Sequence, residues 1–144
     1  MSVRLDINAF QPYREGRYPS FTSSENRCTH VGKNVHGHMV RQFKIDGEVF
    51  PKGTSPERCD YLLLNDEAKT SYYIELKGSD LEKAIEQIEG TIAMIAPSIP
   101  TYSVYRRIVY KTATHKIRES KVLLWQKRNI KSAAIKERYL EENI

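Results

Sequence analysis

Three charged side chains stand at the ends of two apolar runs in the middle of this 144-residue sequence. Asp60 opens the run "DYLLL", and Glu75 and Lys77 close the run "SYYIELK". A buried charge is costly unless it is paired or bound to a metal ion. Three charges at these positions therefore indicate a site that uses them.

The period of a β-strand predicts how these residues meet. Side chains alternate between the two faces of a strand, so Glu75 and Lys77 share one face of the strand expected over 70–77. A short polar turn separates this strand from the one expected over 58–64, which favours an antiparallel hairpin. Asp60 and Glu75 then come together at one end of the sheet.

Two carboxylates held close together repel each other unless a cation lies between them. Mg²⁺ takes oxygen ligands, usually one or two carboxylates together with waters and substrate phosphate. Asp60 and Glu75 therefore predict a Mg²⁺ site, and Lys77 beside them could orient a water or stabilise charge that develops on a phosphate. The alternative is a salt-bridged strand end in which Lys77 pairs with a carboxylate and no reaction occurs.

The elements around these residues predict an α/β fold. An apolar stripe at helical spacing follows the second strand, with Ser79 or Asp80 as its N-cap and Pro97 as its end. The expected elements are strands over 39–45, 58–64, 70–77 and 101–112 and helices over 78–96 and 119–128, while 131–144 could be helix or strand. This order predicts a short mixed central sheet flanked by helices.

The whole chain, 1–144, is expected to be a single domain. Residues 1–37 read as a loop-rich lead-in, in which a short helix could begin at Ser23 or Ser24. Residues 38–112 form the core that carries the motif, and residues 113–144 form a basic C-terminal extension.

The context of the Glu-x-Lys tripeptide distinguishes one copy from two others. The tripeptide occurs at 67–69, 75–77 and 119–121, but only the middle copy ends an apolar run and leads into a capped helix. It also has an acid fifteen residues upstream that opens another apolar run. Over about 38–112, the pattern "CDYLLLN", "YYIELKGSD", "AIEQI" resembles the PD-(D/E)XK nuclease superfamily, which has the restriction-endonuclease-like fold.

This resemblance implies a metal site and a catalytic lysine. Asp60 and Glu75 would bind Mg²⁺, with Mn²⁺ able to substitute, and the backbone carbonyl of Leu76 would assist. Lys77 would position the attacking water. Members of the superfamily cleave nucleic acids, mostly DNA, and many act as dimers.

Some positions depart from the superfamily pattern or extend it. Cys59 stands where many members have Pro before the Asp. Members often add a catalytic Glu from the first helix, for which Glu25 is the candidate and Glu15 the alternative. Gln87 matches the Gln of a Gln-x-x-x-Tyr motif on the second helix, but Thr91 replaces its Tyr.

The distribution of charge suggests a polyanionic partner. Residues 101–138 hold eleven Lys or Arg against two acids, a net charge of +9, so the rest of the chain carries −4 of the total +5. Basic surfaces of this kind bind nucleic acid, although a solvated lysine-rich face would look the same. The candidate phosphate contacts are Arg106, Arg107, Lys111, Lys116, Arg118 and Lys121.

We therefore expect a Mg²⁺-dependent endonuclease that hydrolyses phosphodiester bonds in DNA and acts as a homodimer or as a subunit of a nuclease complex. The alternatives are a nucleic-acid-binding module or a protein-interaction subunit with a vestigial nuclease site. The sequence shows no signal peptide or membrane span, and two cysteines make no disulfide framework, so a cytoplasmic protein is expected. The weaker zinc hypothesis rests on residues without standard finger spacing, namely Cys28, His30, His36, His38 and Cys59.

Overall fold

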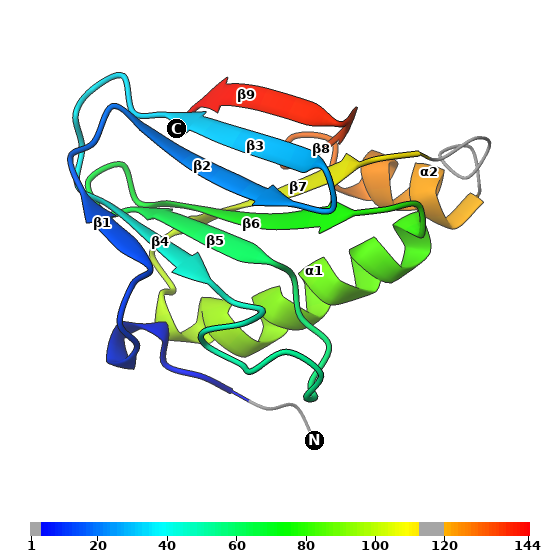
Figure 1. Cartoon of the computed structure of the whole chain (residues 1–144), viewed down its shortest axis with the longest axis horizontal. Helices are drawn as coiled ribbons and strands as arrows, with labels where there is room; N and C mark the ends of the chain where they lie inside the picture. The colour runs from blue at the N-terminus through cyan, green and yellow to red at the C-terminus, as the bar shows by residue number, and fades with distance from the viewer. Residues whose placement is uncertain (1–3, 113–119) are drawn as a thin grey trace.

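A six-stranded mixed sheet forms the centre of the computed structural model, which describes residues 4–112 and 120–144 (Figure 1). Its strands in spatial order are β1 (Arg14–Gly16), β4 (Val40–Lys44), β5 (Tyr61–Asn65), β6 (Thr70–Lys77), β7 (Ser103–Tyr110) and β8 (Ala133–Glu137). A second, three-stranded sheet contains β2 (Ser20–Glu25), β3 (Cys28–Lys33) and β9 (Tyr139–Asn143). The helices are α1 (Leu81–Ile95), α2 (Ser120–Arg128) and the 3₁₀ turns η1 (Ile7–Ala9) and η2 (Ala96–Ser98).

The strand pairing confirms the expected hairpin and the mixed sheet. β5 pairs antiparallel with both β4 and β6, with Tyr61 opposite Ile74. β6 then pairs parallel with β7, with Glu75 opposite Ile108, and β7 pairs parallel with β8. The α/β class is therefore confirmed, but the two faces of the sheet are covered differently. Both helices pack on one face and the small sheet packs on the other (Figure 1).

Helix α1 forms where its periodicity predicts. The Asp80 side chain accepts a hydrogen bond from the Lys83 backbone N–H at 3.0 Å, which caps the helix. Its buried face includes Leu81, Ala84 and Ile88, spaced at helical intervals. Among residues 4–112 and 120–144, no helix combines the length and the apolarity needed to cross a bilayer.

Strand β5 is buried on both faces because it lies between the two cores. Leu62 and Leu64 pack with α1, whereas Leu63 packs with the small sheet. The small sheet approaches closely at Gly32, where an added Cβ would lie 3.0 Å from a methyl group of Leu63. This arrangement fixes the ends of β5 and β6, and with them the charged residues of the motif.

The expectation of a loop-rich lead-in over 1–37 is wrong, because this segment contains β1, β2 and β3. The helix expected from Ser23 or Ser24 is also wrong, since both residues belong to β2. Ser23 is buried and Ser24 is exposed, which is the alternation of a strand rather than a helix. Asn26 and Arg27 have φ values of 51° and 60°, so they form the two-residue turn of the β2–β3 hairpin.

Residues 131–144, which could have been helix or strand, form two strands that join different sheets. β8 extends the main sheet, and β9 pairs parallel with β3. Between the sheets, Arg107 Nε lies 2.8 Å from Glu142 Oε2, and His30 Nε2 lies 2.7 Å from the same oxygen. Burial would raise the pKa of Glu142, but the hydrogen bonds from His30 and Arg107 hold it below its usual value.

Replacing Glu142 by Ala is expected to destabilise the fold by about 3 kcal/mol, because it leaves the largely buried Arg107 without its partner. Urea denaturation measures the change. Glu141→Ala is the matched control, since Glu141 is exposed and lies 3.8 Å from the exposed Lys33. Equal effects of the two substitutions would contradict a role for the buried network.

Candidate active site

Asp60 is fixed beside the end of β6 by hydrogen bonds of its backbone and of its carboxylate. Its backbone N–H donates to the Ile74 carbonyl at 3.1 Å, and its carbonyl accepts from the Ile45 N–H at 2.8 Å. Its carboxylate Oδ2 accepts from the Leu76 backbone N–H at 2.8 Å. Because Leu76 follows Glu75 directly, these contacts bring the two predicted carboxylates together.

Thr91 ties the start of β5 to helix α1. Its hydroxyl accepts a hydrogen bond from the Cys59 backbone N–H at 2.7 Å and donates to the Gln87 carbonyl at 2.7 Å. Thr91 is fully buried. Thr91 therefore positions the segment that carries Asp60.

The two carboxylates lie in an environment that disfavours their charge. Asp60 is 7% exposed and Glu75 is 2% exposed. Burial raises the pKa of Asp60 to about 6. Burial and, next, repulsion from Asp60 raise the pKa of Glu75 to about 9, although Lys77 opposes the rise. Glu75 Oε1 is buried without a hydrogen-bond partner, so this oxygen is available to a further ligand.

Lys77 and Gln87 meet on the side of the site that faces helix α1. Lys77 Nζ donates a hydrogen bond to Gln87 Oε1 at 3.2 Å, although the two residues come from β6 and α1. Lys77 as a whole is half-buried. The structure therefore brings Gln87 to the predicted catalytic lysine.

Glu25 lies near the site, but on strand β2 rather than on a helix. Its charge contributes to the raised pKa of Asp60, after the effect of burial. Glu15, the alternative, lies on β1 opposite Arg41, which in turn pairs with Leu64 at the far end of β5. The structure thus groups Glu25 with Asp60 and places Glu15 at the other end of the sheet.

The β2–β3 turn packs against the site and was missed in the sequence. Asn26 Nδ2 donates to the Leu76 carbonyl at 2.8 Å, and Cys28 Sγ donates to the Lys77 carbonyl at 3.6 Å. A carbonyl oxygen has two lone pairs, so the Leu76 carbonyl keeps one for another ligand. An Asn between two alternating segments was the signal for this turn.

The β4–β5 loop supplies a further carboxylate that sequence reasoning missed. Asp46 raises the pKa values of both Asp60 and Glu75, in each case less than burial does. Asp46 Oδ1 accepts from Arg58 Nη2 at 2.7 Å, and Asp46 Oδ2 lies 3.6 Å from Lys52 Nζ. The Asp-Gly dipeptide at 46–47 is typical of a turn, but it does not indicate that Asp46 contributes to the site.

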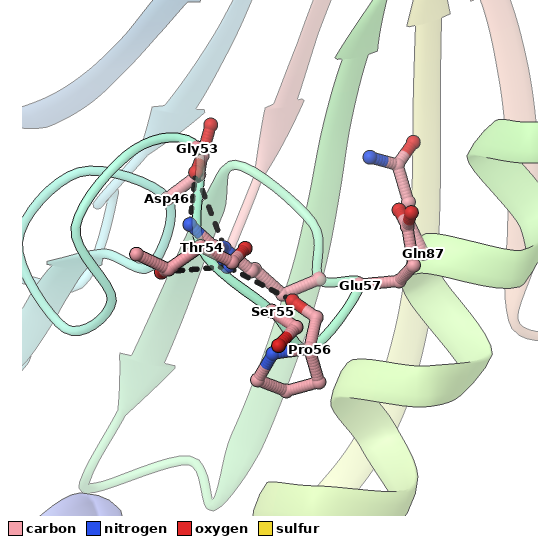
Figure 2. A pocket seen from close by; sticks show the side chains of 8 residues that line it. Asp46, Gly53, Thr54, Ser55, Pro56, Glu57 and Gln87 are labelled. Atoms are coloured by element: carbon pink, nitrogen blue, oxygen red, sulfur yellow. Dashed lines mark hydrogen bonds and ion pairs between the residues drawn. The ribbon is translucent and has the colours of Figure 1, made fainter.

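A pocket of about 350 Å³ opens beside these residues. Gln87 on α1 lines one side of it, and the loop 53–58 lines the other (Figure 2). The buried Arg58 shapes this loop by donating to the carbonyls of Pro51 at 2.7 Å and Pro56 at 2.9 Å, and to that of Thr54. The pocket adjoins the predicted catalytic group through the contact between Gln87 and Lys77.

The oxygen donors fit a hard divalent cation. Two carboxylates, Asp60 and Glu75, and the Leu76 carbonyl are all oxygen ligands, and Glu75 Oε1 is an orphaned buried acceptor. Within the described part of the chain, no three His, Cys, Asp or Glu side chains are arranged to hold a metal by themselves. The set therefore suits Mg²⁺, which commonly keeps several waters and takes substrate phosphate as a ligand.

The residues of the zinc hypothesis lie in separate places, except that the ring centroids of His36 and His38 are 5.4 Å apart. His30 pairs with Glu142 between the sheets, and His38 Nδ1 lies 3.2 Å from Asn65 Nδ2. Cys28 Sγ donates to the Lys77 backbone carbonyl at 3.6 Å, and Cys59 Sγ donates to the Tyr61 carbonyl at 3.5 Å. These positions do not support a shared zinc site.

Three of the predicted phosphate contacts already have acidic partners in the protein. Arg106 Nε lies 2.6 Å from Glu89 Oε2, and Arg107 is paired with Glu142. Lys121 is exposed on α2, 3.7 Å from Glu82 on α1. Lys116 and Arg118 lie outside the described residues.

Other basic residues surround the end of the sheet that holds the site. The Lys111 backbone N–H donates to the Lys77 carbonyl at 3.0 Å, and Arg138 Nε donates to the Lys111 carbonyl at 3.4 Å. Arg27 is exposed at the tip of the β2–β3 hairpin. Arg27 and Arg138 were missed as site residues because nothing in their local sequence links them to the motif.

Comparison with known proteins adds no family to this description. Searches with protein-family models, against curated proteins and against solved structures each find no match. A functional assignment accordingly depends on the geometry of the site.

Proposed function

We propose that the chain is a Mg²⁺-dependent endonuclease that hydrolyses phosphodiester bonds in DNA. The observation that supports this most strongly is the buried pair Asp60–Glu75, with Oε1 of Glu75 unpartnered and Lys77 on the next position of the same strand face. A salt-bridged strand end normally pairs its buried carboxylate oxygens. A cation site accounts for that oxygen.

Each residue has a distinct part in the proposed reaction. Asp60, Glu75 and the Leu76 carbonyl would hold the cation, which would supply Lewis-acid stabilisation of negative charge on the phosphate. Lys77 orients the attacking water and stabilises charge on the phosphate oxygens, and Gln87 holds Lys77 in place. The water oxygen forms a bond to phosphorus and gives up a proton to solvent, one P–O ester bond breaks, and the leaving oxygen takes a proton from solvent.

We place the phosphate backbone of DNA across Arg27, Lys111 and Arg138. Arg27→Ala, Lys111→Ala and Arg138→Ala should each weaken DNA binding and lower the slope of log K against log salt by about 0.9 per lost phosphate contact. Fluorescence anisotropy across a salt series measures this. Lys127→Ala is the control because Lys127 is exposed at the end of α2, away from the motif. The same loss in the control would indicate a diffuse basic surface instead.

Cleavage of supercoiled plasmid in Mg²⁺, Mn²⁺ and EDTA tests the activity. We expect cleavage with either metal and none in EDTA, and we expect Asp60→Asn to abolish it. Glu57→Gln is the matched control because Glu57 also lies at the pocket but its side chain is 57% exposed. Nicked product indicates one site acting alone, whereas linear product indicates the homodimer that we also propose. Salt-sensitive DNA binding without cleavage would favour the binding module, and neither activity would favour an interaction subunit.

A further inference from the structure

Lys52 occupies an unusual position among the carboxylates of the site. Its Nζ lies 3.0 Å from Glu25 Oε1 and 3.6 Å from Asp46 Oδ2. The Asp46 backbone N–H donates to the Asp60 carbonyl at 3.3 Å, which joins this pair of carboxylates to the proposed metal site. One ammonium group therefore lies between two carboxylates that come from separate segments of the chain.

The acidic cluster of Glu25, Asp46, Asp60 and Glu75 holds four carboxyl groups, against the three neighbouring bases Lys52, Arg58 and Lys77. The Lys77 ammonium also bonds to Gln87. Oε1 of Glu75, a residue that is 2% exposed, has no hydrogen-bond partner, so this oxygen can take a cation as a ligand. Lys52 supplies positive charge to the outer part of this cluster only.

The two bases of the β4–β5 loop differ in how firmly they are held. Arg58 has a side chain that is only 4% exposed, and it donates to Asp46 and to several loop carbonyls. The Lys52 side chain is 57% exposed, and its partners are the two carboxylates. Lys52 can therefore move into solvent at little cost, whereas Arg58 cannot.

We infer that Lys52 is an internal counter-cation that competes with the divalent metal for the acidic cluster and swings away when the metal binds. This inference rests on the metal site of the proposed function. A divalent ion at Asp60 and Glu75 would repel the ammonium group and attract the same carboxylates. Lys52 thus sets how much metal is needed to fill the site, and it holds Glu25 and Asp46 together in the metal-free protein.

Binding of Mn²⁺ alone, followed by electron paramagnetic resonance at low ionic strength, tests the inference. Lys52→Gln should bind Mn²⁺ about fivefold more tightly than the wild-type protein, because a repelling charge is gone. Lys52→Arg, which keeps the charge, should bind as the wild type does. Lys33→Gln is the matched control, because Lys33 is also an exposed lysine paired with a carboxylate, at Glu141 on the small sheet.

The outcomes separate the inference from the proposed function. Tighter binding in Lys52→Gln alone supports both, provided that Asp60→Asn removes the binding. If the wild type binds Mn²⁺ and Lys52→Gln binds it equally or more weakly, the counter-cation role of Lys52 is overturned and the metal site is not. Binding in Lys52→Gln but not in the wild type supports the counter-cation and contradicts a functional metal site in the native chain. Absence of binding in both proteins overturns both proposals.

Discussion

Lys77→Ala is expected to lower the rate of Mg²⁺-dependent cleavage about 1,000-fold without weakening metal binding. The Lys77 ammonium is not a metal ligand, and its contact with Gln87 directs it toward the site. Removing one positioned group that stabilises charge in a transition state commonly costs a factor of about 10² to 10³. Single-turnover cleavage measures the rate, and Mn²⁺ binding measures the affinity.

Gln87→Ala supplies the graded comparison for this prediction. Its amide contacts the lysine, so we expect the cleavage rate to fall about tenfold. A fall that is larger at low than at high metal concentration would show that Gln87 also affects the cation. Cleavage by Lys77→Ala within threefold of the wild-type rate would refute the catalytic role. A parallel loss of Mn²⁺ binding would instead identify Lys77 as part of the metal-site architecture.

Glu75→Gln is expected to stabilise the metal-free protein by about 2 kcal/mol at pH 8, while it abolishes cleavage. Burial is the main reason that the pKa of Glu75 rises from 4.5 to about 9 in the folded protein. Between these two values the folded chain binds more protons than the unfolded chain does, so wild-type stability falls as the pH rises. A neutral amide at this position removes that loss.

The stability difference between Glu75→Gln and the wild type should therefore grow from pH 5 to pH 8. Urea denaturation in EDTA across this range measures it, and Mg²⁺ should stabilise the wild type but not the variant. Glu82→Gln is a suitable control, because Glu82 lies in the first turn of α1 outside the acidic cluster. A constant difference at all pH values would show that Glu75 is not held in a charge-disfavouring environment.

Local patterns predict the parts of the fold whose apolar residues follow a simple period. The hairpin of β5 and β6 and helix α1 are of this kind, because most of their buried positions are aliphatic or aromatic. The β2–β3 hairpin is different, because three of the five buried positions of its strands are Ser23, His30 and Gly32. Ser23 lies under the hairpin and accepts from Gln42 Nε2 at 3.0 Å, a contact between sheets that no local pattern contains.

The same distinction applies to the site. Alternation along β6 was enough to place Glu75 and Lys77 on one face, and the hairpin brought Asp60 to them. Asp46 and Lys52 reach the site from a loop whose path depends on the buried contacts of Arg58. The count of basic residues in the C-terminal region predicted phosphate contacts. It could not reveal that a basic residue such as Arg107 is already paired with an acidic residue of the protein, Glu142.

The small sheet joins segments that lie far apart in the sequence. β3 pairs with β9, and His30 in β3 bonds to Glu142, a residue 112 positions later. The same sheet carries the β2–β3 turn that holds Asn26 on the Leu76 carbonyl. Loosening β9 should therefore also loosen the turn that supports Leu76, although β9 itself carries no residue of the proposed site.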